Sequence, residues 1–207
     1  MGKRRGASSA RSPRGRPGAG SAPDDEQVFN DARRFLANHA LESLAQVEPR
    51  AVQQCAEAIL SAEHVFTYGV GRSGLVAQAF AVRLVQLGLR AHFIGDIATP
   101  VVDEGDVGIL ISNVGQTMSA VQTANIMRRV GAKVVVLTAN LSSKLAQAGN
   151  VIIFIPVAGE SRQKSLAPLG TVFEDSAMIL LDALVPVLMK KLGETEESMR
   201  ARHAIWV

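Results

Sequence analysis

The stretch His64–Leu87 reads HVFTYGVGRSGLVAQAFAVRLVQL and decides the fold. Its first part, His64–Val70, is rich in β-branched and aromatic residues, which predicts a buried strand. Its last part, Ser73–Leu87, carries apolar residues three or four positions apart, which predicts an amphipathic helix. The glycine-rich turn Gly69–Gly74 joins the two. A strand that turns directly into a helix is the building unit of α/β proteins.

The same alternation continues toward the C-terminus. Four further strands are predicted, over Arg90–Ile94, Val107–Ile111, Lys133–Thr138 and Val151–Ile155. Helices are predicted over Thr117–Val130, Ser142–Ala148, Thr171–Leu192 and Glu194–Arg202. The strands are runs of Val, Ile and Leu without polar alternation, as in a parallel sheet covered on both faces. We therefore predict an α/β protein with a doubly wound five-stranded parallel sheet, a flavodoxin-like three-layer αβα sandwich.

Two helices are predicted ahead of this sheet. Apolar residues between Val28 and Val47 fall at helical spacing, and the acidic residues 24–26 suit the positive end of a helix dipole. Pro49 interrupts the pattern, and a second helix follows it. Cys55, the single cysteine, lies on the apolar stripe of that helix. We expect an inert core thiol, and one cysteine excludes an intrachain disulfide and a cysteine-based zinc site.

Residues 1–23 form a basic extension of different composition. They contain six Lys or Arg side chains, no acidic one and, after Met1, no large apolar residue, so disorder is predicted. Removing these six charges from the net charge of +3 leaves −3 for residues 24–207. Three interpretations of the extension stay open: a functionally silent segment, an arm that binds polyanions weakly, and an organellar transit peptide.

Residues 24–207 are predicted to form one domain. Hydrophobic residues make up 47% of the chain, which is typical of a folded protein. The apolar runs are far shorter than the ~20 residues that cross a bilayer, and no apolar signal segment opens the chain. We expect a cytoplasmic protein without a membrane or nucleic-acid partner. His39, His64 and His92 lack metal-ligand spacing, so structural roles and no metal are expected.

The turn Gly69–Gly74 is the first of three loops that carry chemistry. Its glycines let the backbone approach a ligand, and the helix that follows offers free N–H groups to an anion. Arg72 and Ser73 add a cation and a hydroxyl. The segment also matches the dinucleotide fingerprint G-x-G-x-x-G, with Asp96 near the end of the second strand as the ribose-binding acid. A phosphate site and a dinucleotide site are therefore both compatible with this turn.

The second loop, Ser112–Thr117, follows the third strand and opens another helix. Two loops with hydroxyl groups at adjacent helix N-termini favour a pocket for one phosphate group over a dinucleotide site. The alternative is that Ser112 is a turn residue and Thr117 an N-cap.

The third loop, Pro168–Asp175, leads into the long helix near the C-terminus. Thr171 and Glu174 have the spacing of a capping box, which gives Glu174 a structural interpretation. The functional alternative is that Glu174 faces the pocket as a general base.

These loops resemble those of the sugar isomerase (SIS) domain family and, within it, of the 6-phospho-3-hexuloisomerases. The resemblance covers residues 27–204. It rests on the segments Gly71–Ala77, Phe80–Leu84, Gly95–Pro100, Glu104–Asp106, Pro168–Asp175 and Met199–Ala204. Such enzymes interconvert D-arabino-3-hexulose 6-phosphate and D-fructose 6-phosphate in the ribulose monophosphate pathway without a cofactor. The resemblance also implies a homotetramer.

The resemblance implies roles for particular residues. Glu174 would move the proton between C2 and C3 through an enediolate, with Arg72 and His203 as candidates for the proton transfer between the oxygens. His203 would then approach a neighbouring subunit's pocket, and its alternative is a solvated histidine. The substrate phosphate would be bound by Ser73, Ser112, Asn113, Gln116 and Thr117.

The second loop departs from the family pattern. The family usually reads Ser-Gly-Ser-Gly-Glu-Thr, whereas residues 112–117 read Ser-Asn-Val-Gly-Gln-Thr. Val114 lacks a hydroxyl group that is worth about 0.5–1.5 kcal/mol as one hydrogen bond, and Gln116 lacks a carboxylate. Two alternatives follow: a phosphosugar-binding protein without catalysis, and an isomerase of another phosphosugar such as arabinose 5-phosphate or sedoheptulose 7-phosphate.

Overall fold

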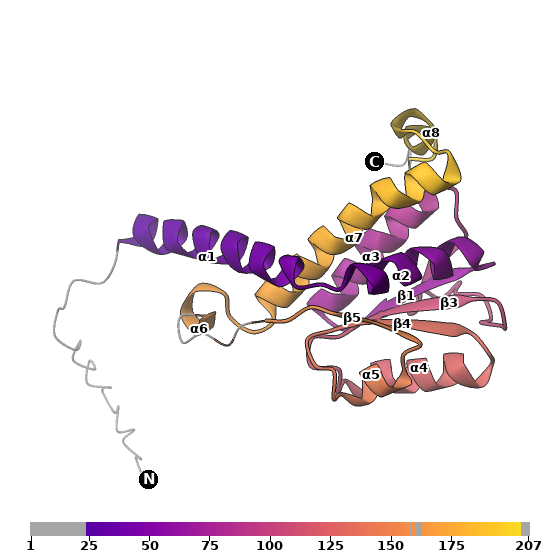
Figure 1. The fold of residues 1–207 in the computed structure, drawn as a ribbon, viewed down its shortest axis with the longest axis horizontal. Helices are drawn as coiled ribbons and strands as arrows, with labels where there is room; N and C mark the ends of the chain where they lie inside the picture. The colour runs from indigo at the N-terminus through magenta and orange to yellow at the C-terminus, as the bar shows by residue number, and fades with distance from the viewer. Residues whose placement is uncertain (1–23, 158, 160–162, 204–207) are drawn as a thin grey trace, which may run out of the picture.

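The computed structural model describes residues 24–157, 159 and 163–203. Five parallel strands form its sheet in the order β2-β1-β3-β4-β5 (Figure 1). The strands are β1 (Val65–Gly69), β2 (Ala91–Phe93), β3 (Val107–Ile111), β4 (Lys133–Thr138) and β5 (Val151–Phe154). This is the strand order of a flavodoxin-like doubly wound sheet, and it confirms the predicted fold class.

The helices lie close to their predicted positions. They are α1 (Asp25–Ala45), α2 (Pro49–Ser61), α3 (Arg72–Gln86), α4 (Met118–Arg129), α5 (Lys144–Ala148), α6 (Gln163–Leu166), α7 (Thr171–Leu192) and α8 (Glu196–Ala201). Pro49 is the first residue of α2, where its missing N–H costs no helix hydrogen bond. Helix α6 was not predicted, because a single turn carries no apolar periodicity.

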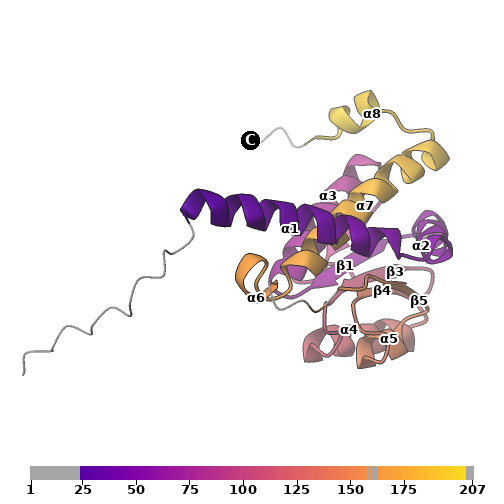
Figure 2. The same ribbon diagram turned by 60° about the vertical axis from the view of Figure 1, so that its left-hand side comes forward.

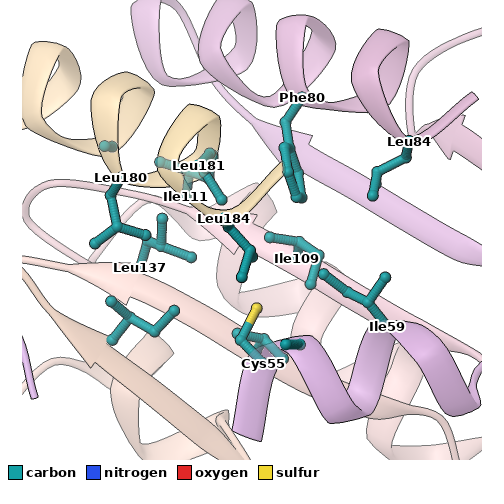
Figure 3. Close-up of a cluster of buried hydrophobic side chains, with 14 of the residues drawn as sticks. Cys55, Ile59, Phe80, Leu84, Ile109, Ile111, Leu137, Leu180, Leu181 and Leu184 are labelled. Atoms are coloured by element: carbon teal, nitrogen blue, oxygen red, sulfur yellow. The ribbon is translucent and has the colours of Figure 1, made fainter. Parts of the chain in front are cut away.

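Helices cover both faces of the sheet (Figures 1 and 2). The larger core lies between the sheet and α2, α3 and α7, and Figure 3 shows Phe80, Leu84, Ile109 and Leu184 converging in it. The smaller core lies on the opposite face and includes Leu110 of β3 and Ala124 of α4. All five residues of β3 are buried, which explains why the strands lack polar alternation.

Cys55 lies in the larger core and is fully buried. Burial raises the pKa of its thiol to about 12, so the thiol stays protonated at neutral pH. This confirms the prediction of an inert core cysteine.

The predicted disordered extension, residues 1–23, lies outside the described residues, and so do residues 204–207. The proposed boundary between extension and domain therefore stays a prediction. Within the described part of the chain, the helices are too short or too polar to span a bilayer.

Two histidines meet on the α4 side of the sheet, at the edge that β2 forms. The rings of His64 and His92 lie 5.2 Å apart, and the His92 ring also lies 5.3 Å from that of Phe66. Asp106 is buried beside them and accepts hydrogen bonds from the backbone N–H groups of His64 and Asp103. Nε2 of His92 is buried without a hydrogen-bond partner. This environment favours the uncharged form of His92.

Desolvation lowers the pKa of His92, the charge of His64 lowers it further, and Asp106 opposes both. The unfolded chain therefore binds a proton at His92 at a higher pH than the folded chain does. Well above the ordinary pKa of 6.5 His92 is uncharged in both states, so it does not make the free energy of unfolding depend on pH. Below that pKa the unfolded chain binds the proton more readily, and the free energy of unfolding falls as the pH falls.

We predict that urea unfolding shows a smaller loss of stability between pH 7.5 and pH 5.5 in His92→Phe than in the wild type. Phenylalanine cannot titrate and can keep the ring contact with Phe66. Gln122→Asn, on the exposed surface of α4, serves as the control and should keep the wild-type loss. An equal loss in His92→Phe and wild type would contradict the prediction.

Candidate functional site

The turn between β1 and α3 places two predicted site residues at the carboxyl edge of the sheet. A Cβ on Gly69 would lie 2.6 Å from the carbonyl carbon of Ser73, and a Cβ on Gly74 would lie 2.7 Å from the carbonyl oxygen of Gly69. Only two glycines allow the strand end and the first helical turn to touch in this way. Arg72 and Ser73 therefore begin α3 directly beyond β1.

Glu174 reaches the same edge from α7. The N-cap of α7 is Gly170, which makes no side-chain cap hydrogen bond. The capping-box interpretation of Thr171 and Glu174 is therefore wrong, because α7 begins at Thr171 itself and the Thr171 hydroxyl donates to the carbonyl oxygen of Pro168. The Glu174 carboxylate is buried and turns toward α3.

Arg72, Ser73 and Glu174 form one cluster. Nε of Arg72 donates to Oε2 of Glu174 at 2.6 Å, and Oγ of Ser73 donates to Oε1 at 3.5 Å. The carboxylate is thus held through both oxygens, while the Arg72 side chain stays about half exposed. Ser73 was predicted to bind phosphate, and in the structure its hydroxyl contacts the carboxylate.

Asp175 joins this cluster and was not predicted. Nη2 of Arg72 lies 3.3 Å from Oδ1 of Asp175. Burial raises the pKa of Asp175, Arg72 opposes the shift, and the carboxylate of Glu174 adds to it. In the sequence, Asp175 is distinguished only by following Glu174. Successive helix residues point in directions about 100° apart, so its contact with Arg72 could not be inferred.

The second predicted loop adopts a closed turn beside this cluster. Oγ of Ser112 accepts a hydrogen bond from the N–H of Gly115 and lies 3.3 Å from Oγ1 of Thr117. Ser112 is buried, and Thr117 is the N-cap residue of α4 without a side-chain cap hydrogen bond. The two hydroxyl groups therefore meet at the N-terminus of α4, as a phosphate site requires.

Asn113 and Gln116 differ in their surroundings. The side chains of Gln116 and Val114 are exposed. The backbone carbonyl of Asn113 accepts from the N–H of Ala139 and from Oγ1 of Thr138, which ties the loop to the end of β4. Its side chain extends toward Gly170, where a Cβ would lie 2.9 Å from Nδ2 of Asn113 and 3.3 Å from Oε1 of Glu174.

His203 lies away from the other predicted site residues in the same chain. It follows α8, and α8 lies beyond the C-terminal end of α7 (Figures 1 and 2). Arg202, its neighbour, donates to the carbonyl oxygen of Gln86 at the last turn of α3. Arg72 lies at the first turn of that helix, about 21 Å away along the axis. One chain therefore does not bring His203 to Glu174.

Asp96, the ribose-binding acid of the dinucleotide interpretation, does not lie where that interpretation placed it. β2 ends at Phe93, three residues before Asp96, so Asp96 does not end the strand as predicted. Asp96 instead lines a surface groove along β2 and α3 with Val82, Val85 and Phe93. Among residues 24–157, 159 and 163–203, no three His, Cys, Asp or Glu side chains are grouped so that they could hold a metal ion.

Known proteins resemble this chain over most of its length. The SIS domain model matches residues 58–185. A Bacillus subtilis protein named 3-hexulose-6-phosphate isomerase is 35% identical over 173 residues, covering 82% of this chain and 94% of that protein. A Methanocaldococcus jannaschii protein of the same name is 33% identical over 147 residues, covering 70% and 78%.

A solved structure from Methanococcus jannaschii also matches. Its TM-score is 0.77 at 26% identity, and the match covers 86% of this chain and 99% of that one. Its description infers a molecular function of 3-hexulose-6-phosphate isomerase.

We predict that Gly115→Ala destabilises the protein more than Gly170→Ala. Gly115 has φ +61°, and a Cβ there would lie 2.5 Å from Cβ of Ser143, so backbone strain of about 1–3 kcal/mol adds to a clash. Gly170 has φ −96°, which alanine adopts freely, and the nearest atom is the movable end of Asn113. Urea unfolding measures both. Equal losses would mean that the 112–117 loop is not held as described.

Proposed function

The chain belongs to the SIS domain family, and from that premise we propose that it is a sugar-phosphate isomerase that interconverts D-arabino-3-hexulose 6-phosphate and D-fructose 6-phosphate. The observation that carries the proposal is the carboxylate of Glu174, buried and held by Arg72 and Ser73 beside the hydroxyl groups of the 112–117 loop. The relatives named 3-hexulose-6-phosphate isomerase support the choice of substrate.

The reaction moves hydrogen within one molecule. Glu174 takes the proton from C2 of the 3-ketose, the electron pair forms the C2–C3 double bond, and the carbonyl oxygen on C3 becomes an enediolate oxygen. A proton passes from the oxygen on C2 to the oxygen on C3, and Glu174 returns its proton to C3. Substrate and product have the same oxidation level, so the reaction needs no redox cofactor. A positioned base of this kind contributes about 10²- to 10⁴-fold in rate.

The phosphate group would bind at the N-termini of α3 and α4. These helices follow β1 and β3, which are neighbours in the sheet, so their first turns lie at one edge. Hydrogen-bond donors to the phosphate would come from the hydroxyl groups of Ser112 and Thr117 and from the free N–H groups of α4. Such a site binds an anion without a cluster of Lys or Arg side chains. Gln116 and Asn113 were also expected to bind phosphate, and the exposed Gln116 can turn toward a ligand.

We propose that His203 acts from a neighbouring copy in a homotetramer. Within one chain it lies at the opposite end of α3 from Arg72. A second chain placed with its α8 near this edge would bring an imidazole to the enediolate oxygens, where its two ring nitrogens can accept one proton and donate another.

A phosphosugar-binding protein without catalysis is the second candidate. Val114 and Gln116 replace a hydroxyl and a carboxylate of the usual loop, and both are exposed at its tip. An increase in the thermal unfolding midpoint with fructose 6-phosphate, together with no turnover, would favour this candidate. Tests with arabinose 5-phosphate and sedoheptulose 7-phosphate would reveal an isomerase of another phosphosugar.

We predict that Glu174→Gln lowers kcat by at least about 10²-fold, because the amide cannot accept the C2 proton. The substrate is made in situ from ribulose 5-phosphate and formaldehyde by hexulose-phosphate synthase, and fructose 6-phosphate is measured by a coupled assay. Glu42→Gln, the same change on the exposed surface of α1, is the matched control. Full activity in Glu174→Gln would exclude Glu174 as the base, and an inactive wild type would exclude the reaction.

We predict that Glu174→Gln and His203→Asn are each impaired alone and recover activity when co-expressed. Mixed oligomers then contain sites in which an intact Glu174 meets an intact His203 of another copy. Glu174→Gln mixed with Arg72→Ala is the matched control and should not recover, because one chain supplies both residues. The absence of recovery in the first mixture, or full activity in His203→Asn, would refute a role for His203 across subunits.

A further inference from the structure

We propose that Asn113 is a catalytic residue, whose side-chain amide donates to the enediolate oxygen rather than to the phosphate. This inference rests on the proposed function and deepens it, because it assigns the donor that stabilises the negative charge. The sequence had placed Asn113 among the phosphate-binding residues.

The position of the Asn113 amide supports this role. Nδ2 of Asn113 and Oε1 of Glu174 both lie against Gly170, at 2.9 Å and 3.3 Å from the point where a Cβ would stand. The amide of Asn113 and the proposed base therefore both lie against the same residue. Because Gly170 has no side chain, both groups can approach its backbone this closely.

The backbone of Asn113 is held by hydrogen bonds to the end of β4 and the residue after it. The carbonyl oxygen of Asn113 accepts hydrogen bonds from Ala139 N–H at 3.0 Å and from Thr138 Oγ1 at 3.1 Å. Thr138 is fully buried at the end of β4. The loop therefore holds Asn113 in place before a ligand arrives, and a donor fixed in advance needs no reorganisation during the reaction.

The side-chain amide of Asn113 is available to a ligand. Asn113 is half-buried, and its amide makes no hydrogen bond to any of the residues that the structure describes. An amide group carries two N–H donors and one acceptor oxygen. It can thus donate to an oxygen of the ligand without breaking an internal contact.

The order of groups along the site matches the order of atoms in the substrate. Ser112 and Thr117 meet where the phosphate on C6 would bind, and Glu174 lies where the proton leaves C2. Asn113 follows Ser112 in the chain and extends toward Glu174. Its amide would meet the oxygen on C3, which carries the negative charge once the proton has left C2. Nε and Nη2 of Arg72 are already engaged by Glu174 and Asp175, whereas the amide of Asn113 is not.

The test compares kcat with KM in Asn113→Ala and Asn113→Asp. A donor that acts mainly in the transition state changes kcat and leaves KM nearly constant. We expect Asn113→Ala to lower kcat about 10²-fold with KM within about threefold of the wild type. Asn113→Asp should lower kcat at least as far, because an ionised carboxylate cannot donate and repels the enediolate.

Two further variants separate the explanations. Thr117→Val should raise KM for the phosphosugar and abolish the thermal stabilisation by inorganic phosphate, whereas Asn113→Ala should keep that stabilisation. Asn125→Asp, on the exposed surface of α4, is the matched control and should behave as the wild type.

The outcomes are distinct. A raised KM with intact kcat in Asn113→Ala would return Asn113 to the phosphate site, and unchanged kcat and KM would remove it from the reaction. Either result overturns the inference while the isomerase activity of the wild type stands. An inactive wild type would instead remove the proposed function on which the inference rests.

Discussion

The backbone contact between Gly69 and Gly74 is the constraint on which the rest of the site depends. A side chain on either residue would overlap the backbone of the other segment, since a Cβ on Gly69 would lie 2.6 Å from the carbonyl carbon of Ser73 and a Cβ on Gly74 would lie 2.7 Å from the carbonyl oxygen of Gly69. With hydrogen atoms in their place, α3 begins directly beyond β1 and its first N–H groups face the edge of the sheet. The turn itself therefore sets the positions of Arg72 and Ser73 at the start of α3.

The strand order brings the turn before α3 next to a second loop. β1 and β3 are neighbours, so the turn before α3 and the loop before α4 lie side by side. α7 packs on α3 in the larger core, and the ion pair between Arg72 and Glu174 joins residues that are 102 positions apart. Segments from three parts of the chain therefore meet at one edge, where ligands of doubly wound sheets commonly bind.

Much of this could be inferred from the sequence, and the exceptions share a cause. The hydroxyl groups of Ser112 and Thr117 lie close together, because a short loop between a strand and a helix leaves them few other arrangements. Ser73 contacts Glu174, and Asp175 contacts Arg72, through packing between α3 and α7. Spacing along a chain does not specify such contacts, since they depend on how two distant helices are rotated.

The parallel sheet, the leading helices and the three loops that carry chemistry could be predicted from the sequence. This was possible because periodicity, β-branched runs and glycine positions act on neighbouring residues. The tertiary structure alone showed that the Glu174 carboxylate turns toward α3 instead of capping α7, that Asn113 extends toward it, and that His203 lies at the opposite end of α3. These depend on where whole helices begin and how they pack, which is settled by burial of the shared core and not by local spacing.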